Sequence, residues 1–346
     1  MKPGSYTALA TPFTPDGMRI DQKGLEQLIA FQIANGITGI LAVGTTGESP
    51  TLGWNEHNAV VDTVARLCRD NCLSIAGAGS NNTQEALNAT EHAAKRQVDA
   101  VLLVDPYYNG PSSLEIRREY VAPIAARFPG MEIIPYVIPG RTGAQLLPED
   151  LALLNQAHPN VSGVKEATAD LNNMRRTRAC CGDDFLILSG DDAMTFDMMT
   201  DPAIAAAGVI SVASNIAPGA VSQLVAKLMT GDREGASALL EGLAPLFSLV
   251  TVKTTESTPH GEVVCRARNP LALKTLMRLL GMPSGPCRPP LGKMTRKGLD
   301  VVLAAGRKMW TDHPEILQPI ETFFGVTIAD RLDDPQYQEG LYYSEY

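Results

Sequence analysis

The sequence predicts an α/β protein, a (β/α)8 barrel followed by a small helical domain, and three observations lead to this fold. Eight short apolar runs, rich in β-branched residues, recur along the first two thirds of the chain. Usually about 15 to 25 residues separate one run from the next, and these stretches carry apolar residues at helical spacing. Eight alternating units in about 225 residues are typical of a closed parallel barrel.

The runs are predicted to be strands buried on both faces, because most of them are nearly continuous in apolar or small residues. They lie at 7–13, 39–47, 73–79, 100–108, 132–140, 161–168, 185–191 and 208–214. A doubly wound sheet is the alternative fold. It would be favoured by a GxGxxG motif after the first run, and the chain has none there.

Helices are predicted between the runs, with the clearest apolar stripes in residues 21–34 and 55–68. Asp21 has a suitable side chain to cap the first of these helices. Ser80 or Asn82 can cap the helix that follows the third run. These start signals support the alternation of strand and helix.

After Pro218 the sequence predicts helices and no further strand. The helical segments are 219–230, 233–250, 268–281 and 297–309, with a loop rich in proline and glycine at 281–292. We therefore divide the chain into a catalytic barrel (1–225), a C-terminal helical domain (226–308) and an extension (309–346). Apolar residues from Ile316 to Ile328 predict that the extension docks on the body or on a neighbouring subunit, and a stabilising extra helix is the simpler interpretation.

Charge and cysteine content exclude several classes of protein. Among 346 residues, 29 are Lys or Arg and 38 are Asp or Glu, which gives a net charge of −9, whereas a nucleic-acid binder is expected to be basic. No run approaches the roughly 18 apolar residues of a membrane helix, and no signal peptide is apparent. Six cysteines without a CxxC pair and five scattered histidines predict reduced thiols, a cytoplasmic location and no metal site.

The active site of such a barrel lies at the C-terminal ends of the strands, and Lys165 is the most informative residue there. A lysine inside a buried strand loses its hydration, and burial favours the neutral amine that attacks carbonyl groups. An ion pair with a barrel carboxylate such as Glu166 is the alternative. We favour a lysine that forms a Schiff base.

Other polar residues follow neighbouring strands. Tyr108 and Tyr136 have phenols that can relay protons, although aromatic packing is the commoner role of a tyrosine. Arg141 has a planar fork that suits a substrate carboxylate, with a surface salt bridge as its alternative. Gly44 and Gly47 flank two threonines where backbone N–H groups can cradle an anion. The GTTGES run lacks the GK[ST] ending of a P-loop, so a nucleotide site is not predicted.

Four motifs together resemble one enzyme family. They are GTTGES at 44–49, YYN at 107–109, GRTG at 140–143 and KEAT at 165–168. These motifs are similar to those of the 4-hydroxy-tetrahydrodipicolinate synthases, formerly dihydrodipicolinate synthases. The resemblance covers about residues 4–308 in collinear order. GTTGE and the KEAT lysine are shared by the wider superfamily of pyruvate-dependent class I aldolases and N-acetylneuraminate lyases, whereas YYN and GRTG are more specific to the synthases.

The resemblance implies condensation of pyruvate with L-aspartate 4-semialdehyde, the first committed step toward diaminopimelate and lysine. It implies no metal or organic cofactor, because Lys165 itself forms the imine with pyruvate. Tyr136 would move protons through Thr46 to Tyr108, which in this family reaches in from a neighbouring subunit. At least a tight dimer is therefore implied, and the family suggests a homotetramer.

Further residues are implied to hold the two substrates, the pyruvate carboxylate by paired threonines and the semialdehyde carboxylate by an arginine. They are Thr45, Thr46, Arg141, Gly190 and Ile210. The sequence departs from the family pattern at one position near these residues. Val137 replaces the asparagine that usually follows the tyrosine, which puts a supporting hydrogen bond in doubt.

A second set of residues resembles the family's site for feedback inhibition by L-lysine at the subunit interface. A carboxylate such as Glu85 can pair with the ammonium group of lysine, and Trp54 can pack on its stem; the tryptophan is the variant of plant-like enzymes. An ordinary interface without a ligand is the alternative. The positions are Ser49, Pro50, Trp54, His57, Asn81, Glu85 and Tyr107.

Two other functions remain possible from the sequence. A related pyruvate-dependent enzyme, such as N-acetylneuraminate lyase or a keto-sugar-acid aldolase, would share Lys165, but the arginine of GRTG and the tyrosine pair argue against it. An inactive lysine-binding paralogue would not need Lys165, Tyr136, Thr46 and Tyr108 together.

Overall fold

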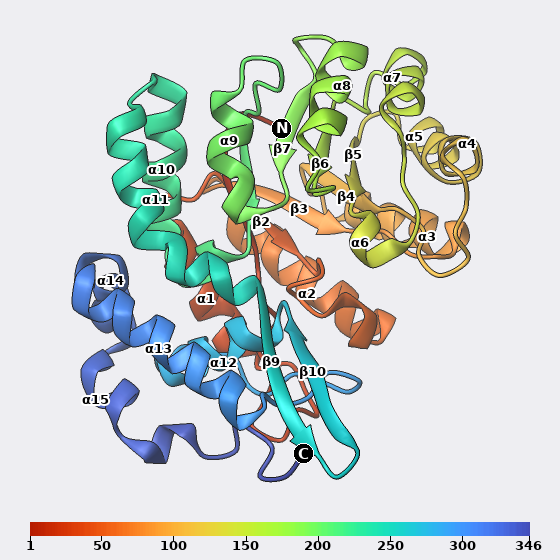
Figure 1. Cartoon of the computed structure of the whole chain (residues 1–346). Coiled ribbons are helices and arrows are strands. Elements are labelled where there is room, and N and C mark those ends of the chain that lie inside the picture. Colours follow the sequence, from red (N-terminus) through yellow and green to blue (C-terminus); the bar gives the residue numbers. More distant parts are fainter.

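The computed structural model describes all 346 residues, and its centre is a closed barrel of eight parallel strands (Figure 1). Each strand pairs with the next, and β1 closes the ring by pairing with β8. The strands are β1 (Gly4–Ala8), β2 (Gly39–Ala42), β3 (Leu73–Gly77), β4 (Ala100–Val104), β5 (Glu132–Val137), β6 (Gly163–Glu166), β7 (Leu186–Ser189) and β8 (Gly208–Ser211). The predicted fold class is confirmed, and each predicted run contains or overlaps one strand.

The first predicted strand, residues 7–13, begins three residues after the observed one and extends too far. β1 ends at Ala8, and the chain then leaves the barrel, so that Phe13 forms an isolated antiparallel bridge with Ile20. The apolar character of residues 9–13 belongs to this buried excursion rather than to the strand.

Helices connect successive strands and cover the outside of the barrel. Those of the barrel are α1 (Gln22–Ala34), α2 (Trp54–Cys68), α3 (Thr83–Lys95), α4 (Ser113–Glu115), α5 (Ala122–Arg127), α6 (Pro139–Thr142), α7 (Pro148–Ala157), α8 (Leu171–Cys181), α9 (Thr195–Thr200) and α10 (Pro218–Thr230). Their starts follow the predicted signals. The Asp21 side chain accepts a hydrogen bond from Gly24 N, and Asn82 caps α3 by accepting from Gln84 N.

Side chains alternate between two apolar layers along each strand, as strands require. One layer fills the barrel and includes Leu41, Ile134, Tyr136 and Ile210. The other layer lies between the strands and the helices, and Val137 and Val164 belong to it. On β6, this alternation directs Lys165 inward and Glu166 outward.

The prediction that no strand follows Pro218 is wrong. An antiparallel hairpin of β9 (Thr251–Thr258) and β10 (Gly261–Arg268) lies between α11 (Arg233–Phe247) and α12 (Leu271–Leu279). Figure 1 shows it projecting away from the barrel beside the C-terminal helices. One face of β9, with Val252, Thr254 and Glu256, is at least partly covered, and Lys253 and Thr255 between them are exposed. The division of the chain at residues 225 and 308 stays a prediction.

The last segment of the chain packs on the protein as α13 (Arg296–Asp312), α14 (Pro314–Phe324) and α15 (Ile328–Asp333). Phe323 and Phe324 of α14 place their rings 5.3 and 5.2 Å from the ring of Phe31 on α1. Ile320 and Ile328 are fully buried. The C-terminal extension thus covers the first helix of the barrel in the same chain.

Candidate active site

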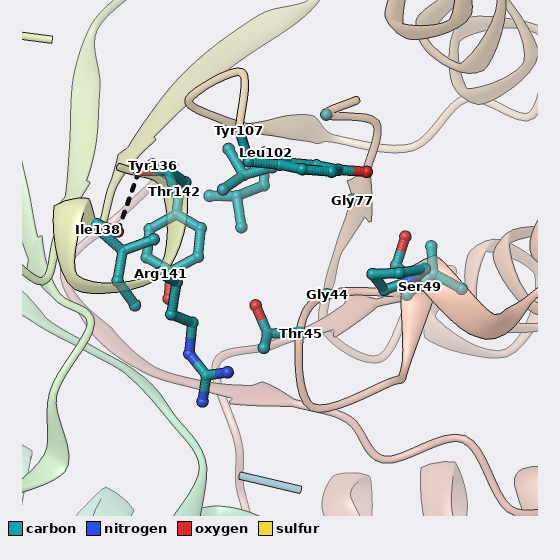
Figure 2. A pocket seen from close by; sticks show the side chains of 14 residues that line it. Gly44, Thr45, Ser49, Gly77, Leu102, Tyr107, Tyr136, Ile138, Arg141 and Thr142 are labelled. Atoms are coloured by element: carbon teal, nitrogen blue, oxygen red, sulfur yellow. Dashed lines mark hydrogen bonds between the residues drawn. The ribbon is translucent and has the colours of Figure 1, made fainter. Parts of the chain in front are cut away.

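A cavity of about 250 Å³ opens at the C-terminal end of the barrel strands (Figure 2). Tyr136, Ile138 and Arg141 lie at one end of it, and Ser49 lies at the other, with Thr45 between them. The residues that line it come from the ends of β2 to β5 and the following loops: Val43, Gly44, Thr45, Ser49, Pro50, Gly77, Gly79, Leu102, Val104, Tyr107, Tyr136, Ile138, Arg141 and Thr142. The motifs after the second, fourth and fifth runs therefore meet in one cavity.

Lys165 lies beside this cavity rather than among its lining residues. Its side chain is 4% exposed, and its Nζ lies over the ring of Tyr136, 4.3 Å from the ring centroid. Burial lowers the pKa of Lys165 to about 7, with the Asp192 carboxylate opposing this shift and the Arg141 charge adding to it. A large part of the amine is therefore neutral near pH 7. The alternative of an ion pair with Glu166 is not realised, because Glu166 accepts hydrogen bonds from Thr168 N and Asn173.

Tyr136 lines the cavity and also contacts Lys165 through its ring. Burial raises its pKa to about 12, while the Arg141 charge and the Thr45 side chain oppose the shift. The phenol thus keeps its proton at neutral pH and can donate it. No hydrogen bond joins Tyr136 to Thr46, whose Oγ1 instead accepts one from Asn269 Nδ2 at 3.0 Å.

Arg141 belongs to α6, the single turn that follows β5. Its guanidinium lines the cavity and donates through Nη2 to Asn269 O at 3.1 Å. It forms no ion pair, so its remaining donors are available to an anionic substrate. Burial lowers the pKa of Arg141 from its ordinary value, although arginine stays charged at neutral pH.

The smaller pocket residues are close to these groups. A Cβ on Gly190 would lie 3.1 Å from Lys165 Cε, so the absence of a side chain leaves room for the lysine. Ile210 is fully buried inside the barrel with Tyr136. Val137 points outward into the apolar layer under the helices, so the missing asparagine amide would not have faced the cavity.

Sequence reasoning missed two polar residues beside the site. Asp192 is fully buried after β7, and its Oδ2 accepts hydrogen bonds from Val212 N and Ala213 N, both at 2.9 Å. Asn269 is 5% exposed and bonds Thr46, while its Oδ1 is buried without a partner. Asp192 lies in the SGDD run after the seventh strand, a visible signal; the distance of Asn269 from Thr46 in sequence hid its role.

The two adjacent tyrosines of YYN have different environments. Tyr107 lines the cavity and its ring extends toward the Ser49 end (Figure 2). Tyr108 is 90% exposed, with a left-handed φ of 81°. Tyr108 therefore does not enter the cavity of its own chain.

The second set of predicted residues lies around the Ser49 end of the cavity. His57 is buried and shares a hydrogen bond with Gly77 O at 2.8 Å, and Trp54 places its ring 5.0 Å from the His57 ring. Glu85 accepts a hydrogen bond from Ser80 Oγ at 2.6 Å. Asn81 and Pro50 are exposed. Ser49, Pro50 and Tyr107 line the same cavity as Tyr136, so this group and the Lys165 region are neighbours.

Comparison with known proteins gives the family. The sequence model of the dihydrodipicolinate synthetase family matches residues 1–305. The chain belongs to this family. A 4-hydroxy-tetrahydrodipicolinate synthase of Geotalea daltonii is 39% identical over 292 residues, which are 84% of this chain and 93% of that protein.

Two solved structures of family members superpose on the chain. The dihydrodipicolinate synthase of Cyanidioschyzon merolae with lysine bound has a TM-score of 0.81 and 34% identity, covering 89% of this chain and 98% of that one. The chloride-inhibited dihydrodipicolinate synthase of Acinetobacter baumannii complexed with pyruvate has a TM-score of 0.80 and 31% identity, covering 89% of this chain and 99% of that one.

These relatives confirm the resemblance and the enzyme class that the sequence predicts, a lyase of the class I aldolase type. They do not favour N-acetylneuraminate lyase, a keto-sugar-acid aldolase or an inactive lysine-binding paralogue. No helix in the structure combines the length and the apolar character needed to cross a bilayer.

Proposed function

We propose that this protein condenses pyruvate with L-aspartate 4-semialdehyde, the reaction of a 4-hydroxy-tetrahydrodipicolinate synthase. One observation carries the proposal: a buried lysine with its pKa lowered to about 7 lies against Tyr136, beside a cavity that presents the unpaired Arg141. A neutral amine is the nucleophile that a Schiff base requires, and a free guanidinium suits a carboxylate.

The chemistry begins when the neutral Nζ of Lys165 adds to the keto carbon of pyruvate. Loss of water gives a protonated imine, which withdraws electrons so that the pyruvate methyl group loses a proton. The resulting enamine attacks the aldehyde carbon of the second substrate, and the new alkoxide takes up a proton. The amino group of that substrate then adds to the imine carbon, closes the ring and releases Lys165 as an amine.

The residues of the cavity have distinct roles in this sequence. Tyr136 is placed to give and accept protons at the imine, since it is protonated at rest and lies over Lys165. Thr45 and Thr46 hold the pyruvate carboxylate, and Arg141 holds that of the semialdehyde. Gly190 leaves space beside the imine, and Ile210, which packs with Tyr136 inside the barrel, contributes to the substrate pocket. We expect no metal or organic cofactor in the reaction.

A second copy of the chain completes the proton path. Tyr108 is 90% exposed, so its phenol is free to enter the site of a neighbouring subunit. We therefore infer at least a tight dimer, with a tetramer of such dimers as the expected assembly. Six free cysteines agree with a reducing cytoplasm as the place of the reaction.

L-Lysine is the inhibitor that the second set of residues supports. Glu85 offers a half-buried carboxylate for the ammonium group of lysine, and the ring of Trp54, 43% exposed, is available to pack on its aliphatic stem. Tyr107 and Ser49 line the same cavity as Tyr136. A lysine molecule bound at this second set of residues would therefore lie next to the active site, where it can change the position of the catalytic side chains.

Two measurements test the function. Borohydride reduction in the presence of pyruvate should add a pyruvate-derived mass at Lys165, and this adduct should be absent from Lys165→Ala, which should keep its fold. A coupled assay should then show consumption of pyruvate with aspartate semialdehyde, and inhibition by lysine. Turnover of a sugar aldehyde in place of the semialdehyde would show a different aldolase, and a missing adduct would refute the imine mechanism.

A further inference from the structure

The hairpin β9–β10 returns the chain to the mouth of the active-site cavity. Asn269 N donates to Val250 O at 2.8 Å, so the residues on either side of the hairpin are joined at its base. Arg268 is the last residue of β10, and it stands next to the Asn269 that bonds Thr46. The base of the hairpin therefore borders the catalytic residues, although the hairpin itself extends away from the barrel (Figure 1).

Two arginines connect this base to the turn that follows β5, and their contacts are reciprocal. Arg141 Nη2 donates to the main-chain oxygen of Asn269, the residue after Arg268. Arg268 Nη2 donates to the main-chain oxygen of Gly140, the residue before Arg141. Both distances are 3.1 Å. Each guanidinium thus fixes the backbone beside the other.

The turn 139–142 has few polar contacts with distant parts of the chain. It begins after Ile138 and ends at Gly143, which has a left-handed φ of 69°. Its other hydrogen bonds are local, among them those from Arg141 N and Thr142 N to Ile138 O and from Thr142 Oγ1 to Ile138 O and Ala144 O. Beyond these sequence neighbours, its polar contacts are the two arginine bonds and a long contact of Tyr108 N with Thr142 O at 3.4 Å. The two arginine bonds thus tie the turn that carries Arg141 to the base of the hairpin.

Neither arginine is neutralised. No Asp or Glu oxygen forms an ion pair with Arg141 or Arg268, whereas Arg117, Arg175 and Arg288 all have such partners. Their reciprocal contacts bring the two cations close together, and the charge of Arg268 contributes, after burial, to lowering the pKa of Arg141. Two adjacent unpaired cations in a protein of net charge −9 indicate a place for an anion.

We propose that Arg268 is a positioning residue that determines affinity for the carboxylate of the aldehyde substrate. It holds the Gly140 backbone, so that Arg141 keeps its fork toward the cavity, and its charge adds to the attraction of that carboxylate. The proposal rests on the proposed function, in which Arg141 binds the semialdehyde. Pyruvate binds at the threonines and Lys165, so Arg268 acts on the second substrate alone.

The test compares four forms of the full-length protein. Arg268→Gln removes the charge and shortens the donor, whereas Arg268→Lys keeps a charged donor. Arg266→Gln is the matched control, because Arg266 is an exposed cation on the same hairpin strand without an ion pair. Steady-state kinetics give KM for each substrate, and borohydride trapping with pyruvate reports the first step separately.

We expect Arg268→Gln to raise KM for aspartate semialdehyde by about tenfold, the effect of losing one charge-assisted contact. KM for pyruvate and the trapping rate should stay at wild-type values, Arg268→Lys should recover most of the loss, and Arg266→Gln should match the wild type. Added salt should weaken semialdehyde binding more in the wild type than in Arg268→Gln.

An unchanged KM for the semialdehyde in Arg268→Gln would overturn the inference, as would equal increases for both substrates, which would indicate general damage to the site. The failure of the proposed function has a different signature. In that case the wild type itself would trap pyruvate without consuming the semialdehyde, and the role of Arg268 would fall with it.

Discussion

Lys274 and Glu48 form an ion pair inside the protein, with Nζ 2.5 Å from Oε1 and both side chains almost inaccessible to solvent. The amine also donates to Thr11 O and Pro286 O, and the second carboxylate oxygen accepts from Arg288 N. Every charged atom is thus satisfied. Because Glu48 ends the GTTGE run and Lys274 lies on α12, the pair joins the C-terminal helices to the loop that carries Thr45 and Thr46.

We predict that Lys274→Met destabilises the protein by about 3–5 kcal/mol, because it leaves the carboxylate of Glu48 buried without its partner. The free energy of unfolding in urea measures this loss. The double variant Lys274→Met with Glu48→Gln removes the unpaired charge and should regain part of the stability. Equal loss in both variants would show that the charge of Glu48 is not the cause.

Imine formation should depend on pH through Lys165. Its pKa is about 7, so the ammonium form dominates below that pH and the reactive amine above it. The rate at which the borohydride-trapped pyruvate adduct forms should therefore rise between about pH 6 and 8 and then level off. Initial rates of adduct formation, followed by mass spectrometry, give the midpoint.

Asp192→Asn provides a directional control for this profile. The Asp192 carboxylate raises the pKa of Lys165, so its removal should move the midpoint to lower pH. The asparagine oxygen can still accept from Val212 N and Ala213 N, which preserves the local structure. A shift to higher pH would contradict this electrostatic role.

Asn269→Ala should lower turnover with little change in fold. The substitution removes the hydrogen bond to Thr46 but keeps the main-chain oxygen that Arg141 uses. Loss of one buried hydrogen bond to Thr46, a residue of the proposed proton path, predicts a fall in kcat of about tenfold. Steady-state kinetics give kcat, and an unchanged value would mean that Thr46 is held by other contacts. The melting temperature of the variant checks the fold.

Asp105 should make stability depend on pH. It is buried, and its pKa is raised to about 8 by burial, with only Leu146 N as a donor to the carboxyl. The folded protein therefore holds a proton that the unfolded chain releases above its ordinary pKa of 3.8, so stability falls as pH rises from about 4 to 8. Asp105→Asn keeps an acceptor for Leu146 N and should flatten this decline.

Melting temperatures between about pH 5 and 9 test the role of Asp105. The variant should exceed the wild type most at the alkaline end, where the wild-type carboxyl must ionise inside the protein. Parallel curves for the two proteins would contradict the raised pKa.

The barrel could be predicted because each of its parts has a local signal. Strands buried on both faces give apolar runs. Asp21 and Asn82 mark the beginnings of two helices, because their side chains cap the helix N-termini. Lys165 could be identified for the same reason, since a charged residue in an apolar run is conspicuous. The hairpin was missed because, apart from Val252, the covered face of β9 is built from Thr254 and Glu256 rather than from large apolar residues.

Contacts between distant segments could not be read from the sequence. Asn269 and Thr46 are 223 residues apart, and Arg141 and Asn269 are 128 apart. Nothing in either local sequence specifies the partner, because only the closed barrel and the packing of α12 bring them together. For the same reason the sequence suggested Glu166 as a partner for Lys165, whereas the strand alternation turns these neighbours to opposite faces.

The packing of Phe323 and Phe324 on Phe31 has a consequence for synthesis of the protein. Helix α1 emerges from the ribosome near the beginning of translation, but the rings that cover Phe31 are added almost at the end. Until then an apolar surface on the first helix of the barrel stays open, at the stage when partly made chains are prone to aggregate. A chain shortened before residue 314 would keep that surface exposed permanently.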